Sequence, residues 1–136
     1  MDFLRPKERS WLMSQVRARD TRPELIVRRI VKRLGYSFRT NHPFLPAKPD
    51  LVFPKRHKVI FVHGCFWHRH PRCRKASMPK THVAFWTSKF RQNRLRDRAT
   101  LRELQRRGWR TLVLWECETR APESLRQRVR QYLEGS

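Results

Sequence analysis

A short segment in the middle of the chain gathers side chains that bind metals or move protons. Residues 63–73 read His-Gly-Cys-Phe-Trp-His-Arg-His-Pro-Arg-Cys, so three imidazoles and two thiols fall within eleven residues. The segment follows an apolar run, and packing alone requires no such composition. Thiolates and imidazoles are preferred zinc ligands, and imidazole is also a general base near neutral pH. We therefore expect the chemistry of this protein to lie here.

The spacing within this segment predicts a structural zinc site. Cys65 and Cys73 flank an arginine-rich, proline-containing loop that cannot form a core, and Cys117 follows a predicted strand, where it can supply a further ligand. The alternative is that one or two of these cysteines are small buried residues. We favour zinc because three cysteines, an odd number, do not suit a disulfide framework. Spacing alone leaves open whether His68 or His70 completes the site.

A second candidate metal ligand lies upstream. Phosphodiester hydrolysis needs a carboxylate that holds Mg²⁺ and a route for activating water. Asp50 stands at the start of a predicted strand, and the paired strand ends about a dozen residues later, which is the layout of a PD-(D/E)xK nuclease core. Where that core carries Glu-x-Lys, however, this chain has Val62-His63-Gly64. Pro-Asp is also a common turn dipeptide, so Asp50 alone is weak support for a nuclease.

The charge of the chain indicates a polyanionic partner. Lys and Arg number 33 against 11 Asp and Glu, a formal net charge of +22. Nucleic acid best relieves such self-repulsion, although a membrane surface or ribosomal RNA could also balance it. No apolar stretch approaches the ~20 residues of a spanning helix, and no signal-peptide core opens the chain. We expect a soluble, cytoplasmic protein without a membrane partner.

The helices that must position these residues follow from apolar periodicity. Residues 1–20 carry too little apolar surface for a core element and are expected to form an arm. Thr21-Arg22-Pro23-Glu24 has the spacing of a capping box, and the helix that follows should end at Gly35. A long helix is expected over residues 81–107, with an inner stripe of Val83, Trp86, Phe90, Leu101 and Leu104. A closing helix is defined by Leu125, Val129, Tyr132 and Leu133.

The strands complete a predicted α/β fold. Strands are expected at residues 36–40, 50–53, 58–63 and 111–115, with a turn at residues 54–57. The strand at residues 58–63 is apolar on both faces and should be central. The order α, β, β, β, α, β, α predicts helices packed on a mixed sheet, in one domain over residues 21–136.

The motifs together resemble the very-short-patch repair endonucleases, the Vsr family, over about residues 8–120. The string His-Gly-Cys-Phe-Trp-His at residues 63–68 is the most specific match. Further matches are Asp-Thr-Arg-Pro-Glu at 20–24, Lys-Pro-Asp at 48–50, Phe85-Trp86, Asn93, Arg96-Asp97, Gly108-Trp109-Arg110 and Trp115-Glu116-Cys117. The resemblance implies a restriction-endonuclease-like fold of PD-(D/E)xK type with a structural zinc. It also implies a Mg²⁺-dependent enzyme that nicks one DNA strand beside a T:G mismatch left by deamination of 5-methylcytosine.

The resemblance further implies roles for residues at the cleavage site. Asp50 would bind Mg²⁺ with the main-chain carbonyl of Val62, and His68 would be the general base or position the water. Asp97 would orient His68. His63 and Glu24 would contact the phosphate or metal-bound water, although the capping-box position explains Glu24 equally well. The implied zinc ligands are Cys65, His70, Cys73 and Cys117.

Other residues acquire DNA-binding roles from the same resemblance. Phe66, Trp67 and Trp86 would wedge into the base stack beside the mismatch, and Met13 would insert from the other groove. An apolar wedge unstacks a mispair more easily than a paired step, so it discriminates between them. Core packing is the alternative for these aromatics, and we favour it for Trp109 and Trp115. The implied contacts to phosphates or base edges are Asn93, Arg91, Arg94 and Arg96, although this arginine-rich stretch could also be a solvated helix face.

Two alternatives to mismatch repair remain open at this point. One is a restriction-type endonuclease on the same fold that cuts paired DNA, and the other is a non-catalytic zinc-containing nucleic-acid-binding module. A monomer is expected for a nicking enzyme. The sequence identifies neither the target context nor any mismatch-repair protein that acts with it. The link from His70 to Cys73 is also one residue longer than in the family pattern, which leaves the loop shape open.

Overall fold

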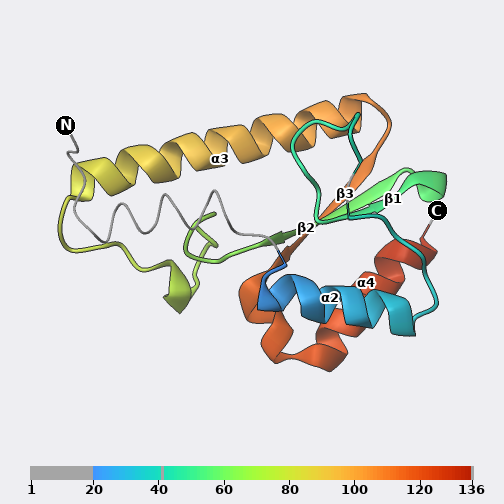
Figure 1. Ribbon diagram of the computed structural model, residues 1–136. Helices are drawn as coiled ribbons and strands as arrows, with labels where there is room; N and C mark the ends of the chain where they lie inside the picture. The colour runs from blue at the N-terminus through green and yellow to red at the C-terminus, as the bar shows by residue number, and fades with distance from the viewer. Residues whose placement is uncertain (1–19, 41, 136) are drawn as a thin grey trace.

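A three-stranded sheet forms the centre of the protein (Figure 1). The computed structural model describes residues 20–40 and 42–135. Strand β2 (Lys58–His63) lies between β1 (Leu51–Phe53), which is antiparallel to it, and β3 (Arg110–Trp115), which is parallel to it. The sheet is therefore mixed, and the prediction that residues 58–63 form the central strand is confirmed.

Helices cover both faces of this sheet (Figure 1). Helices α2 (Arg22–Arg33) and α4 (Pro122–Glu134) share one core with the sheet, and α3 (Val83–Arg106) shares a second core with its opposite face. The first core contains Val27, Val31, Leu51, Phe53, Ile60, Leu114, Leu125, Val129 and Leu133. The second contains Val52, Val59, Phe61 and Leu104. The α/β architecture expected from the sequence is thus confirmed.

The helix ends follow the glycine signals closely. Gly35 and Gly108, with φ of 90° and 87°, lie just beyond α2 and α3, in a conformation that glycine adopts without strain. The inner stripe of α3 was predicted less well. Val83 is 49% exposed because it stands at the first turn of the helix, whereas Asn93, which was not part of the predicted stripe, is buried.

The strand predicted at residues 36–40 is wrong. Within this segment only Arg39 pairs with the sheet, through two backbone hydrogen bonds to Val52 of 2.8 and 2.7 Å. The chain then passes Pro43, Pro46 and Pro49. Proline has no N–H to donate to a ladder, so the pairing cannot continue in that direction.

The capping box predicted for α2 is wrong in detail. Thr21 is the N-cap residue, but its side chain makes no cap hydrogen bond. Glu24 accepts the N–H of Asp20, one residue before the cap, at 3.1 Å. The predicted arm and its Met13 lie outside the described residues, except for Asp20. Among the residues the structure describes, no helix has the length and apolar character needed to cross a membrane.

A buried lysine joins the sheet to the last helix. Lys58 opens β2, is 3% exposed, and donates from Nζ to the carbonyls of Tyr132, Leu133 and Gly135 at the end of α4. The bonds to Tyr132 and Leu133 measure 2.7 and 3.3 Å. A cation at this position satisfies carbonyls that have no intrahelical donor and interacts favourably with the helix dipole.

Replacing Lys58 should destabilise the fold without touching the predicted site. Lys58→Met keeps the apolar stem but leaves the carbonyls without their donor, so the free energy of unfolding should fall by about 1–3 kcal/mol. Urea denaturation followed by circular dichroism measures the change. The control is Lys55→Met in the exposed turn before β2, which should leave the midpoint unchanged. Equal midpoints for the two variants would show that Lys58 does not anchor α4.

Candidate functional site

The three strands bring the predicted site residues to one edge of the sheet. β2 ends at His63 and β3 at Trp115, and these two residues are partners in the parallel register. Because β1 is antiparallel to β2, Asp50, which precedes β1, lies at the same edge. A cleft of about 590 Å³ opens there. Its walls include Glu24, Asp50, Val62, His63, Trp67, His68, Arg96, Asp97 and Glu116.

Two carboxylates stand together in this cleft. Asp50 is half-buried and accepts the N–H of Val62 at Oδ2, at 2.6 Å, while Glu24 is 6% exposed. Burial, together with the charge of Glu24 and a hydrogen bond to it, raises the pKa of Asp50 to about 7, against the opposing effects of the Val62 N–H and the charge of Arg28. The raised pKa favours the protonated form of Asp50, and a bound cation could replace that proton. Carboxylate oxygens in this arrangement suit a hard divalent ion.

Helix α2 aims Glu24 into the cleft. Its Oε2 accepts from Arg28 at 3.4 Å as well as from the N–H of Asp20, and Arg28 also pairs with the Asp20 carboxylate at 2.8 Å. Glu24 does not close a capping box on Thr21. Helix capping alone therefore does not explain why this carboxylate stands in the cleft wall.

The two imidazoles of the cleft lie face to face. A turn in which the N–H of His68 donates to the carbonyl of Gly64 at 3.1 Å carries His68 back over His63. The ring centroids are 3.8 Å apart at an interplanar angle of 9°. Burial, with the nearby His68, lowers the pKa of His63 to about 4, so His63 is neutral at pH 7. His68 Nδ1 lies 2.7 Å from Asp97 Oδ2. When the His68 ring accepts a proton, the Asp97 carboxylate can stabilise the positive charge that results.

The turn between these histidines depends on a close approach. A Cβ on Gly64 would lie 3.0 Å from Cδ1 of Trp67, tighter than ordinary van der Waals contact. Gly64 thus lets the Trp67 indole lie against the backbone at the cleft wall. No other residue at position 64 would accept this contact without moving the indole.

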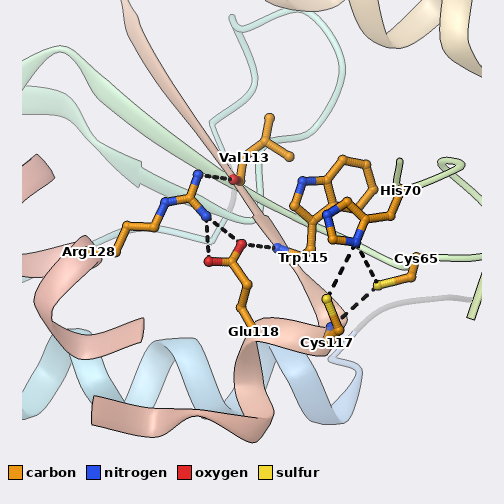
Figure 2. Close-up of polar contacts among 7 residues, drawn as sticks. All are labelled: Cys65, His70, Val113, Trp115, Cys117, Glu118 and Arg128. Carbon is orange, nitrogen blue, oxygen red and sulfur yellow. Dashed lines mark hydrogen bonds and ion pairs between the residues drawn. The ribbon is translucent and has the colours of Figure 1, made fainter. Parts of the chain in front are cut away.

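The remaining histidine of the segment lies with the three cysteines. The ligand atoms of Cys65, His70, Cys73 and Cys117 all lie within 4.8 Å of one another. His70 Nδ1 is 3.6 Å from Cys65 Sγ and 3.4 Å from Cys117 Sγ (Figure 2). All three cysteines are free thiols, and burial raises the pKa of Cys65 to about 12. This set can hold a metal ion, which would keep such buried thiols ionised.

The link from His70 to Cys73, which is longer than in the family pattern, does not prevent this convergence. Within this link Arg72 adopts a left-handed conformation, with φ of 58°. His68, the other ligand candidate left open by the spacing, lies instead with His63 and Asp97.

An aromatic cluster adjoins the loop that carries Cys65, His70 and Cys73, called the metal-binding loop below because these residues could hold a metal ion. Phe66 and Trp67 are half-buried and meet edge-on at 4.6 Å and 80°. Phe66 packs on Phe90 at 5.3 Å and on Trp86 at 5.9 Å, and these two partners are 3% and 6% exposed. Trp67 also lines the cleft, whereas Trp86 is buried within the cluster.

Polar residues of α3 connect this cluster to the cleft. Asn93 is 3% exposed, donates to the Trp67 carbonyl at 3.3 Å and accepts from Arg96. Arg91, Arg94 and Arg96 are exposed, and only Arg96 of the three lines the cleft.

The sequence interpretation gave no role to Glu116, which the structure places between the two sites. Its Oε1 accepts the N–H of Cys65 at 3.3 Å, and its Oε2 pairs with Lys75 at 3.2 Å. The signal in the sequence was its place in the Trp115-Glu116-Cys117 match, directly before Cys117. A carboxylate that contacts the metal-binding loop and also lines the cleft holds the two together.

Comparisons with known proteins agree with this geometry. Residues 1–75 match the family model described as DNA mismatch endonuclease Vsr. A type II nicking enzyme, V.XorIIP, of Xanthomonas oryzae pv. oryzae is 44% identical over 135 residues, covering 99% of this chain and 98% of that protein. The DNA mismatch endonuclease Vsr of Escherichia coli K12 is 40% identical, covering 86% of this chain and 74% of that protein. A type II nicking enzyme of Neisseria meningitidis, V.NmeAIP, is 35% identical, covering 94% and 91%.

Removing one sulfur from the metal-binding cluster should release its metal and weaken the fold. Cys117→Ser takes away a ligand that ties the end of β3 to the loop. Bound metal should fall from about one ion per chain to a small fraction, and the free energy of unfolding by about 3 kcal/mol or more. Mass spectrometry of dialysed protein and urea denaturation measure the two effects. Ser77→Ala, in the same loop, is the control. Full metal content in Cys117→Ser would contradict the site.

The raised pKa of Asp50 should make the free energy of unfolding of the metal-free protein depend on pH. The folded-state pKa of Asp50 is raised from 3.8 to about 7, so its contribution to stability is complete below pH 3.8 and is lost as the pH rises through 7. In buffer without added divalent ions, Asp50→Asn should therefore be more stable than wild type at pH 8, by about 1–3 kcal/mol. The difference in free energy of unfolding between Asp50→Asn and wild type should be smaller at pH 5.

Denaturation midpoints at the two pH values measure this difference. Glu123→Gln, an exposed carboxylate at the start of α4, should differ from wild type equally at both. An Asp50→Asn variant less stable than wild type at pH 8 would show that the carboxylates do not repel each other.

Proposed function

The chain belongs to the Vsr family of DNA mismatch endonucleases, and from this premise we infer that it nicks one DNA strand beside a T:G mismatch in a Mg²⁺-dependent reaction. It is a DNA-nicking endonuclease of mismatch repair. The observation that carries the finer proposal is the meeting of Asp50 and His68 in one cleft, at the same edge of the sheet. A metal-binding carboxylate and a proton acceptor are the two functions that phosphodiester hydrolysis requires.

Asp50 is the proposed Mg²⁺ ligand, together with the main-chain carbonyl of Val62. The raised pKa of Asp50 beside Glu24 supports this assignment. A divalent ion bound between the two carboxylates would offset the repulsion between their negative charges. A bound Mg²⁺ would neutralise charge on the scissile phosphate and activate water. Glu24, held by Arg28, would accept hydrogen bonds from that water.

His68 is the proposed general base. Asp97 holds Nδ1 of the ring, so Nε2 is the nitrogen left to take a proton from the attacking water. His63 packs flat on His68 and stays neutral, so it fixes the ring without adding a competing positive charge. We propose that His63 also contacts the phosphate at its exposed edge.

Zinc is the proposed occupant of the cysteine cluster formed by Cys65, His70, Cys73 and Cys117. A tetrahedral ion with Zn–S of about 2.3 Å and Zn–N of about 2.0 Å separates sulfur from nitrogen by roughly 3.5 Å. The two measured separations, 3.6 and 3.4 Å, fit this value. With four protein ligands the ion has no open position, so its role would be structural.

Phe66 and Trp67 are the proposed wedge at the mismatch. Both lie on the metal-binding loop, and Trp67 already faces the cleft. Unstacking costs least at a mispair, so insertion would favour the T:G site over paired DNA. Trp86 would support the wedge from beneath and contact the bases if the cluster opens. Asn93 would hold the Trp67 backbone and Arg96 in place for contact with DNA.

Positive charge on α3 would hold the DNA backbone. Arg91, Arg94 and Arg96 are exposed on a 24-residue helix that extends about 36 Å, roughly one turn of duplex. Their contacts to phosphate would make binding fall steeply with added salt.

The wider setting follows from the same family membership. We propose that residues 21–136 are one domain whose sheet is the core of a restriction-endonuclease-like fold, because Asp50 directly precedes β1 beside the central strand. Residues 1–20, with Met13, would contact DNA from the opposite groove. The enzyme would act as a monomer on DNA in the bacterial cytoplasm, and mismatch-repair proteins are candidate partners. The relatives are bacterial proteins.

Cleavage of defined duplexes tests this function. Duplexes that differ only in one T:G or T:A pair are labelled on each strand in turn and incubated with and without Mg²⁺. We expect a single cut beside the mismatched T, only with Mg²⁺. Asp50→Asn and His68→Ala should slow it by at least about 10²-fold, because each removes a group that acts in the transition state. His57→Ala, an exposed histidine away from the cleft, should cut like wild type.

Each other outcome identifies a different function. Equal cutting of the T:G and T:A duplexes would support a restriction-type enzyme. Binding without cutting would support a non-catalytic DNA-binding module. Unchanged rates in both active-site variants would overturn the catalytic assignment.

A further inference from the structure

Trp115 occupies the space between the metal-binding cluster and the cleft. It ends β3, directly opposite His63 in the parallel register, and its ring meets the His63 ring edge-on at 5.4 Å and 78°. His70, a member of the cluster, stacks on the same indole at 4.2 Å and 14° (Figure 2). Trp115 is therefore in contact with a histidine of each site.

The ring contacts continue beyond His63. His63 stacks on His68 at 3.8 Å and 9°, and His68 pairs with Asp97 at 2.7 Å. An unbroken series of side-chain contacts thus runs from the metal-binding cluster to the imidazole that acts as general base. Packing was the interpretation that the sequence favoured for Trp115, and packing alone does not account for an indole with a histidine of a different site on each side.

We propose that Trp115 is a positioning residue of the nicking reaction: its indole fixes His63, and through His63 the base His68, relative to the metal-binding cluster. The proposal rests on the proposed function, since it assumes that His68 is the base. Trp115 itself touches no reacting atom.

The backbone of Trp115 is held firmly enough for this role. Its N–H donates to Glu118 Oε1 at 3.0 Å, and the Glu118 carboxylate pairs with Arg128 of α4. Arg128 also donates to the carbonyl of Val113 at 3.2 Å (Figure 2). These bonds fix the last residues of β3 from outside both sites, so the indole is a stable reference against which the two histidines pack.

The metal-binding cluster alone does not fix the ring of His68. Cys65 and His70 bracket His68 in the chain, and the backbone bond to Gly64 sets where its side chain begins. The direction of the ring is set by two contacts, the stack on His63 and the bond to Asp97. Without the indole, His63 could tilt into the vacated space, and His68 would follow it.

Loss of the indole should therefore lower the rate of the chemical step and leave DNA binding intact. Misplacing a catalytic group by about 1 Å can cost 10²-fold in rate. For Trp115→Leu we expect the single-turnover nicking rate at saturating enzyme to fall by about 10- to 100-fold. The enzyme concentration that gives half the maximal rate, and the metal content, should change less than about twofold. Trp115→Phe restores a ring and should recover most of the rate.

A second tryptophan provides a matched control. Trp109, just before β3 at the other end of the strand, is also half-buried and stacks on a histidine, His57, at 5.0 Å and 15°. It is not among the residues that line the cleft. Trp109→Leu should lose stability much as Trp115→Leu does, yet nick at the wild-type rate. A purely structural role for Trp115 would make the two variants alike.

The outcomes separate this inference from the proposed function. If wild type does not nick T:G duplexes, the proposed function fails. If wild type nicks and Trp115→Leu, folded and with its metal, nicks at the same rate, the positioning role is overturned. If the nicking rate of Trp115→Leu falls only in proportion to its metal content, the positioning role is also overturned. Trp115 would then serve to keep the metal bound. Should Trp115→Leu fail to fold, Trp115→Met, which fills the space without a ring, is judged by the same criteria.

Discussion

The parallel pairing of β2 with β3 is the constraint on which the site depends. Its register sets His63 opposite Trp115, so the segments that follow the two strands leave the sheet side by side. One segment carries Cys65 and His70, and the other carries Cys117, so the metal-binding cluster can form only while this register holds. The carboxyl ends of neighbouring parallel strands are a favoured place for ligand sites for the same reason. A shift by one residue would turn His63 to the other face and separate the cluster from its third sulfur.

The protein is strongly basic overall, but several of its few acidic side chains gather in the cleft. Acidic side chains number only 11 against 33 basic ones, yet four of them, Glu24, Asp50, Asp97 and Glu116, line a single cleft. Basic side chains, Lys48 and Arg96, line the same cleft. Under the proposed function, the carboxylates would hold the metal ion while basic side chains in and around the cleft would contact the DNA backbone. Binding and cleavage would then depend on opposite charges in adjacent places.

Most elements could be predicted because their signals are local. The two glycines with positive φ mark helix ends, and the run from Val59 to Val62, apolar on both faces, marks the central strand. The failures have non-local causes. Residues 36–40 have strand-like composition, but the prolines that follow remove the donors a ladder needs. Asn93 is buried because the Trp67 carbonyl, 26 residues earlier, requires a donor, and no periodicity contains that information. In the site, residue types indicated the metal chemistry, but spacing left His68 and His70 as alternatives; the resemblance implied His70 as the ligand, and the turn from Gly64 carries His68 to His63 and Asp97.

The metal-binding loop must hold the proposed general base in a fixed position although it contains little regular secondary structure. Residues 64–82 contain no strand and, apart from the short 3-10 helix Arg74–Ala76, no helix, so no regular backbone pairing holds them. A loop of this kind is ordinarily mobile, and a general base must be held to a fraction of an ångström. Within it Phe66, Trp67 and His68 are consecutive, between Cys65 and His70. If Phe66 and Trp67 act as the proposed wedge and His68 as the proposed base, movement of the wedge at a mispair would be transmitted to the base, because metal ligands on both sides would keep the loop from absorbing it. Fixing both ends of a short segment in this way would couple recognition of the mismatch to cleavage without a separate switch between the two.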